Sequence, residues 1–392
     1  MFRDRTNAPA QDNLPFKRAP TNLSTTDPKS RGVVGEPKAK RAALTQLSNQ
    51  FSTGLVIDWA RRGLGLKKSS SIEIFEDEKE EEPYSTPSAE INDTETKEEN
   101  AFDPCPEYDY DAENKNDDFN VPEYAFDIFA YHRSTENVFV VGDYLEKHPG
   151  ITKDCRALLV DWMIQVNETF AQFNETLYLA VKLVDIYLHN TKEAVPRNEL
   201  ELVACAALFL ASKYEERDPP PINDFIVITE ESFTREALMA KERRVFDTVH
   251  FNLGAPLSYS YLRRYAKVCK IELDTLTLAR YILETSLMFY EFVGASESKM
   301  AAGAFLLALR MKDEKAEWTP VMHKYSGYEA DEVESWVWEL NHMMTMKQSK
   351  KGVYPKLKET VEKYSQEQFF TVTILPLLPD RCDADRPLSC PN

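Results

Sequence analysis

The sequence lacks the closely spaced cysteines that disulfide-bonded domains and zinc sites require. Its six cysteines are scattered over 392 residues, and no C-x-x-C pair occurs among them. The six histidines are equally dispersed and show no metal-ligand spacing. A disulfide framework and a structural zinc are therefore excluded, and we expect a reducing compartment, no metal and no cofactor.

Long hydrophobic runs are absent as well. The longest strictly apolar stretch, residues 202–211, is about half the length that a helix needs to cross a bilayer. Residues 1–5 are not followed by the apolar region of a secretory signal. We therefore expect neither a secreted nor a membrane-spanning protein, and no membrane partner.

The motifs that usually carry catalysis are also missing. There is no Gly-rich phosphate-binding loop, no H-E-x-x-H and no nucleophile elbow. The acidic pairs at 215–216 and 230–231 are adjacent in sequence, so on a helix their side chains diverge by about 100°. They are typical of solvated faces, and no enzyme activity is predicted.

Charge divides the chain into zones. Residues 1–71 hold 13 basic and 5 acidic side chains, whereas residues 72–118 hold 19 acidic residues and three lysines. Both zones are rich in Pro, Ser, Thr and Asn without an apolar period, so we predict that residues 1–118 are disordered. The basic zone has no interleaved aromatics and adjoins an acidic run. This favours a localisation signal or a solvated tail over a nucleic-acid partner.

From about residue 121 onward the apolar pattern is helical. An apolar stripe with steps of three and four residues runs from Leu159 to Phe173, and Asn174 offers an N-cap for a second helix. Asn198 and Glu201 have the spacing of a capping box that opens a third helix. That helix is apolar on all sides over 202–211, which is typical of the centre of a bundle. No β-type alternation is present, so the predicted class is all-α.

The helical region contains an internal repeat. Residues 176–180 (TLYLA) are echoed by residues 275–279 (TLTLA), and residues 204–211 (ACAALFLA) are echoed by residues 301–308 (AAGAFLLA). Either match alone would show only that two helices share alanine and leucine. Two matches in the same order indicate a duplicated helical bundle of about 100 residues per copy.

Residues 155–162 (CRALLVDW) closely resemble the cyclin-box signature M-R-A-I-L-V-D-W. Further matches to A- and B-type mitotic cyclins follow at 174–177, 210–216 and 219–220, and the likeness extends from about 123 to 370. In the second repeat, LRRYAK and DTLTLAR (residues 262–267 and 274–280) look most like the third B subclass.

This resemblance implies two tandem five-helix cyclin boxes with a preceding N-terminal helix, behind a disordered N-terminal tail. We therefore expect a regulatory tail over 1–118, the N-terminal helix and first box over 121–254, the second box and a C-terminal helix over 255–370, and a C-terminal tail over 371–392.

The resemblance also implies a function. A mitotic cyclin activates a cyclin-dependent kinase catalytic subunit by binding it and phosphorylates nothing itself. Cyclin-box transcription adaptors are the alternative, but they bind DNA and should have a basic helical face, whereas residues 119–392 carry a net charge of −10. A hydrolytic enzyme would have to show turnover from the purified chain alone.

The family's kinase-binding residues carry over by motif position. Lys213 and Glu242 match its charged pair. Spacing alone favours another interpretation, in which Lys213 is a cation that caps the end of its helix and Glu242 is an ordinary surface acid. Only the surrounding match to the family favours the kinase-binding role. The other matching positions are Leu210, Tyr214, Glu215, Phe246, Phe251 and, on the N-terminal helix, Tyr124, Ile128 and Tyr131. The apolar residues among them have an alternative role, which is packing within the chain's own bundle.

The family's substrate-docking patch, which accepts R-x-L-type peptides, also has counterparts. This sequence departs from the family at Cys155, where Met is usual, and at Glu201, where Gln is usual. Glu201 has a competing role in the capping box, and Trp162 is equally compatible with core packing. The predicted patch consists of Cys155, Leu159, Trp162, Gln165, Arg197 and Glu201.

Residues 41–49 (RAALTQLSN) fit the destruction-box pattern R-x-x-L-x-x-L-x-N, carried by Arg41, Leu44, Leu47 and Asn49. This predicts ubiquitin-dependent proteolysis at anaphase, with the anaphase-promoting ubiquitin ligase as a second partner. An extended segment can present such a motif without unfolding anything. Basic pairs at 17–18, 61–62 and 67–68 favour import into the nucleus.

Overall fold

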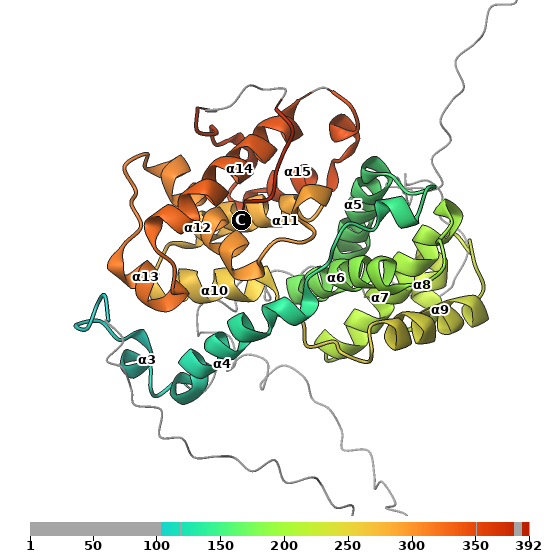
Figure 1. Cartoon of the computed structure of the whole chain (residues 1–392), viewed down its shortest axis with the longest axis horizontal. Coiled ribbons are helices and arrows are strands. Elements are labelled where there is room, and N and C mark those ends of the chain that lie inside the picture. Colours follow the sequence, from blue (N-terminus) through green and yellow to red (C-terminus); the bar gives the residue numbers. More distant parts are fainter. Residues whose placement is uncertain (1–102, 118–119, 350, 380–385, 392) are drawn as a thin grey trace, which may run out of the picture.

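The computed structural model describes residues 103–117, 120–349, 351–379 and 386–391, and within these ranges the chain is helical with no β-strand (Figure 1). The all-α prediction is confirmed. The first bundle contains five α-helices: α5 (Lys153–Phe170), α6 (Asn174–Asn190), α7 (Leu200–Glu215), α8 (Ile222–Ile228) and α9 (Arg235–Thr248). The second also contains five: α10 (Ser258–Val268), α11 (Leu273–Ser286), α12 (Glu297–Lys312), α13 (Pro320–Ser326) and α14 (Ala330–Gln348).

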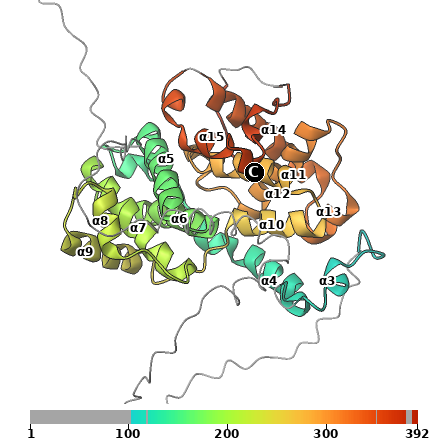
Figure 2. The same ribbon diagram turned by 180° about the vertical axis from the view of Figure 1, so that it is seen from behind.

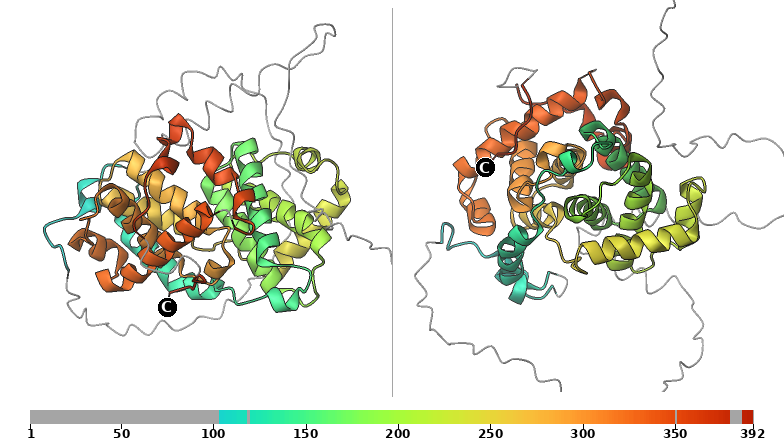
Figure 3. Two further views of the ribbon diagram at one scale, coloured as in Figure 1. Left: turned by 90° about the horizontal axis from the view of Figure 1, so that it is seen from above. Right: turned by 45° about the vertical axis from the view of Figure 1, so that its right-hand side comes forward.

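Shorter elements flank the bundles, which lie side by side in the turned views of Figure 3. Two helices precede them, α3 (Tyr110–Glu113) and α4 (Pro122–Thr135), and α15 (Glu359–Tyr364) follows. Single 3₁₀ turns complete the described chain: η1 (Glu136–Phe139), η2 (Leu145–Lys147), η3 (Arg197–Glu199), η4 (Tyr290–Phe292), η5 (Tyr354–Lys356), η6 (Glu367–Phe369) and η7 (Val372–Ile374). No described helix combines the length and apolar character that a bilayer crossing requires.

The helices α7 and α12 are the central helices of the two bundles, as the repeat predicts. Both bury alanine-rich faces, and neighbouring helices therefore approach them closely. In α12 the approach is tightest at Gly303, where an added Cβ would lie only 2.6 Å from the Cβ of Trp336 on α14. A small residue at this position lets the two helix axes come together.

Two predicted helix caps are wrong. Asn174 is the first residue of α6 and Phe173 occupies the cap position without a side-chain bond. The Phe173 N–H donates instead to the Glu216 carboxylate at 2.7 Å. The capping box of Asn198 with Glu201 does not form either, because η3 leads directly into α7 at Leu200. Tertiary contacts and a preceding 3₁₀ turn satisfy the N–H groups that a local side chain would otherwise bind.

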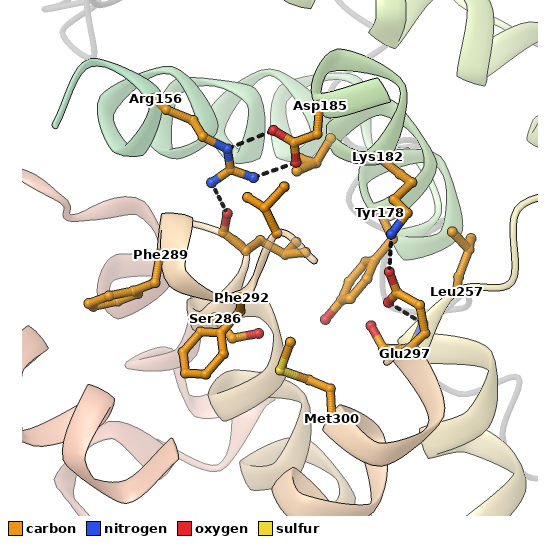
Figure 4. A pocket seen from close by; sticks show the side chains of 14 residues that line it. Arg156, Tyr178, Lys182, Asp185, Leu257, Ser286, Phe289, Phe292, Glu297 and Met300 are labelled. Atoms are coloured by element: carbon orange, nitrogen blue, oxygen red, sulfur yellow. Dashed lines mark hydrogen bonds and ion pairs between the residues drawn. The ribbon is translucent and has the colours of Figure 1, made fainter. Parts of the chain in front are cut away.

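Two cations of the first bundle, Arg156 and Lys182, bind acceptors on the second bundle (Figure 4). The Arg156 guanidinium on α5 donates to both carboxylate oxygens of Asp185 on α6, at 2.7 and 2.6 Å, and to the carbonyl oxygen of Leu287 in the second bundle at 2.8 Å. Nearby, Lys182 on α6 bonds Glu297 on α12 at 2.9 Å. Because buried charges are stable only when paired, these bonds fix how the repeats meet.

The helix α15 adds a second joint between the bundles. Lys363 lies 2.8 Å from Glu168 on α5 and 2.9 Å from Glu284 on α11. Burial alone would lower the pKa of Lys363, yet the two carboxylates raise it, so the side chain is a cation. The backbone N–H groups of Lys358 and Glu359 donate to Asp161, which anchors the start of α15 on α5.

The prediction of disorder over 1–118 is wrong for residues 103–117. This segment folds, includes α3 and packs on α10 and α13, because its carboxylates meet lysines and arginines that a sequence-local view does not place beside it. Residues 1–102, and with them the destruction-box residues 41–49, lie outside the described residues.

The end of the chain also packs more closely than a tail would. Leu378 and Leu388 are buried against the second bundle. The Asn341 amide on α14 donates to the Leu378 carbonyl oxygen at 3.0 Å, and Arg386 forms an ion pair with Glu339 on the same helix. The second bundle therefore extends past residue 370 in the described ranges 371–379 and 386–391.

Candidate partner-binding surface

The structure brings the predicted charged pair together. Lys213 lies in the last turn of α7 and Glu242 lies on α9, and their side chains form an ion pair. The Lys213 ammonium also lies 4.3 Å from the centre of the Phe209 ring, so a cation–π contact fixes its position. Because Lys213 is 41% exposed, the pair contributes only about 0–1 kcal/mol to stability.

Exposed aromatic side chains accompany this pair. Tyr214 is 54% exposed and Phe251 is 63% exposed, both unusual for large apolar groups. Phe251 meets Phe246 edge to face at 4.9 Å between ring centres, just after α9. Leu210 is different: it is buried in the first bundle, so the packing alternative holds for this residue.

The helix α4 presents a second apolar stripe. Tyr124, Ile128 and Tyr131 lie on one exposed face, and the two tyrosines are 60% and 66% exposed. A neighbouring face, about 100° round the helix, carries Ala125, which is buried, and Phe129, which packs 5.8 Å from the ring of Tyr261 on α10. Since α4 already has a packed face, its aromatic stripe is free for a partner.

An acidic cavity lies between these two groups of aromatics. It has a volume of about 170 Å³ and is lined by residues of α4, the ends of α6 and α7, and the segment leading into α10. Burial raises the pKa of the lining residue Glu215, and the nearby Glu175 and Glu216 carboxylates raise it further. Burial also lowers the pKa of His132 on the α4 side. Of the two lining carboxylates, Glu175 is paired with Arg263 at 2.5 Å, and Glu215 has no ion pair of this kind within the described residues.

The predicted docking patch has a buried floor and a half-exposed rim. Cys155, Leu159 and Trp162 on α5 are buried in the first bundle, so the core-packing role applies to Trp162. The Cys155 thiol accepts a hydrogen bond from the Thr152 hydroxyl at 3.2 Å. The rim residues, which come from α5, η3 and the first turn of α7, are Gln165, Arg197 and Glu201.

Sequence reasoning missed the residues that hold α4 in place. Arg133, near the end of α4, donates to the carbonyl oxygen of Ser326, the last residue of α13, at 2.9 Å. Glu136 accepts from the Ser296 hydroxyl at 2.7 Å and from the Ser298 N–H at 3.1 Å, and so binds the start of α12. The sequence signal for them is a charged residue in the last turn of an aromatic helix, followed by another charged residue directly after the helix.

Models of two known domains match this chain. "Cyclin, N-terminal domain" covers residues 127–254 and "Cyclin, C-terminal domain" covers residues 256–378. A solved structure, a viral cyclin from herpesvirus saimiri, superimposes with a TM-score of 0.50 at 18% identity, covering 60% of this chain and 99% of that one. The chain belongs to the cyclin family, whose members are regulatory subunits and not enzymes, and a cyclin-dependent kinase is the partner that this membership implies.

Its relatives place it more narrowly. G2/mitotic-specific cyclin-B3 of Caenorhabditis elegans is 42% identical over 351 residues, which cover 88% of this chain and 86% of that protein. The proteins of the same name from Drosophila melanogaster and Gallus gallus are 41% and 42% identical, over 70% and 67% of this chain. The chain spans 48% and 64% of their lengths. The likeness to the third B subclass is confirmed, and the chain has the regulatory role of a mitotic cyclin.

The sequence predicts no metal and no cofactor, and a metal site would need several ligating side chains close together. Within the described part of the chain, no group of three or more His, Cys, Asp or Glu side chains could hold a metal ion.

Proposed function

We propose that this chain binds and activates a mitotic cyclin-dependent kinase and so controls passage from G2 into mitosis. The observation that carries the proposal is the fixed Lys213–Glu242 pair with exposed aromatics on both sides of it. A stable surface with this much unpartnered apolar area is typical of a protein interface.

The energies assign different roles to the two kinds of contact. Burying each exposed aromatic anchor is worth about 1.5–3 kcal/mol. The exposed Lys213–Glu242 pair contributes about 0–1 kcal/mol. The anchors Tyr124, Ile128, Tyr131 and Phe251 therefore set affinity, while the ion pair sets the geometry in which the kinase is held.

The proposed mechanism is mechanical. In these kinases a strand lysine and a glutamate of helix C must form an ion pair before ATP is aligned for transfer. A rigid partner that grips helix C can hold that pair closed. The buried joints of Arg156 and Lys363 support this role, because a partner that pushes must itself resist deformation.

Co-purification of the full chain with a cyclin-dependent kinase, followed by a phosphorylation assay, tests the proposal. We expect the kinase to be inactive alone and active with the chain, and the chain alone to phosphorylate nothing. A chain that binds none of the mitotic kinases, or that leaves them inactive, would contradict it.

We also propose that the docking patch takes R-x-L-type peptides, with the Glu201 carboxylate facing the peptide arginine. The half-exposed position of Glu201 in the first turn of α7 supports this. Titration of such a peptide should show weaker binding to Glu201→Gln and to a peptide without its arginine. Equal affinity for the wild-type chain, for Glu201→Gln and for the peptide without its arginine would contradict this proposal.

Two further proposals concern the segment before residue 103. We propose that residues 41–49 act as a destruction box read by the anaphase-promoting ubiquitin ligase, and that the basic pairs direct the chain to the nucleus. The match at Arg41, Leu44, Leu47 and Asn49 supports the first. Imaging of the tagged chain with and without the pairs at 17–18, 61–62 and 67–68 tests the second.

The transcription-adaptor alternative would need a free basic face. The helix of highest net positive charge in the described chain is α10, and its three cations are engaged: Arg263 with Glu175, Arg264 with Asp111 and Lys267 with Asn120. Lys270, two residues after the helix, pairs with Glu113. A DNA-binding assay of the purified chain should therefore show no salt-dependent binding.

A further inference from the structure

Residues 103–117, which we call the N-terminal strap, are fastened to the second bundle by polar contacts along their whole length. Lys324 on α13 reaches Asp103 at 2.7 Å and the Tyr108 carbonyl oxygen at 2.8 Å. The Tyr108 hydroxyl donates to the Val268 carbonyl oxygen at 2.7 Å, and the Tyr110 N–H donates to the Tyr325 hydroxyl at 2.7 Å. An acidic segment is thus held on a basic surface.

Arg264 on α10 is the centre of this arrangement. Its guanidinium donates to both carboxylate oxygens of Asp111, one of them at 2.7 Å, and it is only 6% exposed. The same group faces the rings of Tyr110 on the strap, Tyr325 on α13 and Phe129 on α4, at 5.8, 5.0 and 5.5 Å. One buried cation therefore contacts the strap, α4 and the second bundle together.

Apart from the strap, the start of α4 is held by the Lys267 ammonium on α10, which donates to the Asn120 side chain two residues before the helix at 2.6 Å. The cap residue of α4, Val121, is in the left-handed region with φ 46° and makes no side-chain cap bond. A helix of 14 residues with this many exposed side chains is marginal unless tertiary contacts stabilise it. The Arg133 and Glu136 bonds fix only its far end. Figures 1 and 2 show α3 beside the start of α4, at the edge of the second bundle.

We propose that the strap, acting through Arg264, holds α4 in the orientation that presents Tyr124, Ile128 and Tyr131 to the kinase. Arg264 and Asp111 are then positioning residues, remote from the exposed stripe. The effect on kinase binding rests on the proposed function, but the order of α4 in the free chain can be measured without any kinase.

The first experiment is hydrogen exchange on the full chain, read over residues 122–135. Asp111→Ala should leave Arg264 buried without its carboxylate and speed exchange in this helix by at least about tenfold. Asp111→Glu, which keeps the charge, should restore most of the protection. Tyr108→Phe provides a milder second variant that removes the hydroxyl bonded to the Val268 carbonyl oxygen, and it should speed exchange less than Asp111→Ala does.

Two controls separate positioning from general stability. Glu113→Gln removes the exposed pair with Lys270 on the same strap and should leave α4 exchange unchanged. Glu199→Gln removes the Lys241–Glu199 pair of the first bundle, so it should lower Tm without selective exchange in α4. If Asp111→Ala leaves exchange over 122–135 unchanged, or changes it no more than Glu199→Gln does, the proposal is wrong.

The second experiment measures affinity for a mitotic cyclin-dependent kinase that the wild-type chain binds. Opening α4 reduces the competent population, so Asp111→Ala should weaken binding by about tenfold and Glu113→Gln should not. Faster α4 exchange with unchanged affinity would overturn the positioning role. A wild-type chain that binds no kinase would overturn the proposed function instead, while the exchange result would still stand.

Discussion

The guanidinium of Arg156 and the carboxylate of Asp185 form a bidentate pair that is almost completely buried, with side chains 3% and 5% exposed. The Tyr144 hydroxyl donates to the same carboxylate at 2.7 Å. Arg156 also donates to the carbonyl oxygen of Leu287, so the cation of an ion pair inside the first bundle also binds the second bundle. Arg156 therefore contributes to the relative placement of the two boxes, together with the Lys182–Glu297 pair and the bonds of Lys363.

Replacing Arg156 should be severely destabilising. Arg156→Met leaves Asp185 buried without its counter-ion, and we expect a loss of about 3–5 kcal/mol in the free energy of unfolding. Urea denaturation followed by circular dichroism measures this. The control is Lys153→Ala, which removes the exposed pair with Glu291 and should cost less than about 1 kcal/mol. Similar losses in both variants would contradict the assignment.

Removing the charged grip should abolish activation without unfolding the chain. In Lys213→Ala with Glu242→Ala, we expect kinase activity to fall to the level of the kinase alone, while Tm changes little because the pair is exposed. The matched control removes another exposed pair of α9, Arg244→Ala with Glu193→Ala. Full activity of the first double mutant would refute the grip.

The proposed destruction box should control turnover. Arg41→Ala with Leu44→Ala should give a chain that persists past mitotic exit, because the two side chains that the ligase reads are gone. Immunoblotting of synchronised cells measures the half-life, with substitution of Thr45 and Gln46, which fall at the unspecified positions of the pattern, as the control. An unchanged half-life of Arg41→Ala with Leu44→Ala would contradict the proposal that residues 41–49 are a destruction box.

The acidic cavity predicts a pH effect at Glu215. Its pKa in the folded chain is raised above the ordinary value of 4.5 by burial and by two neighbouring carboxylates. The folded state therefore binds a proton more tightly than the unfolded state, so stability falls as pH rises from 4.5 through the raised value.

Glu215→Gln should remove this loss. The variant should match the wild type in acid and be more stable than the wild type at neutral pH. Thermal unfolding across a pH series measures the difference. Glu216→Gln is an unsuitable replacement, because Glu216 also accepts from the Thr176 hydroxyl at 2.6 Å. A stability difference that does not vary with pH would show that the Glu215 carboxyl does not titrate as its burial and its acidic neighbours require.

Much of the candidate surface could be predicted because it follows motifs. Lys213 and Glu242 do meet, and Tyr124, Ile128 and Tyr131 do share an exposed face. The role of Leu210 could not be assigned from sequence, because an apolar residue on an amphipathic or all-apolar helix gives the same sequence pattern whether its side chain faces the core or a partner. The folding of residues 103–117 could not be foreseen either, since acidic composition predicts disorder until a basic surface is placed against it.

The sequence by itself determined the helical class, the duplication and the two small-residue central helices, because apolar periodicity and residue size act over neighbouring turns. Only the tertiary structure decided the cap positions of α6 and α7, at Phe173 and Glu199, the position of α4 and the pairing of charges. Arg264 and Asp111 are 153 residues apart, and no local pattern encodes a contact over that distance. Burial makes such a pair obligatory, and burial exists only once the bundles have packed.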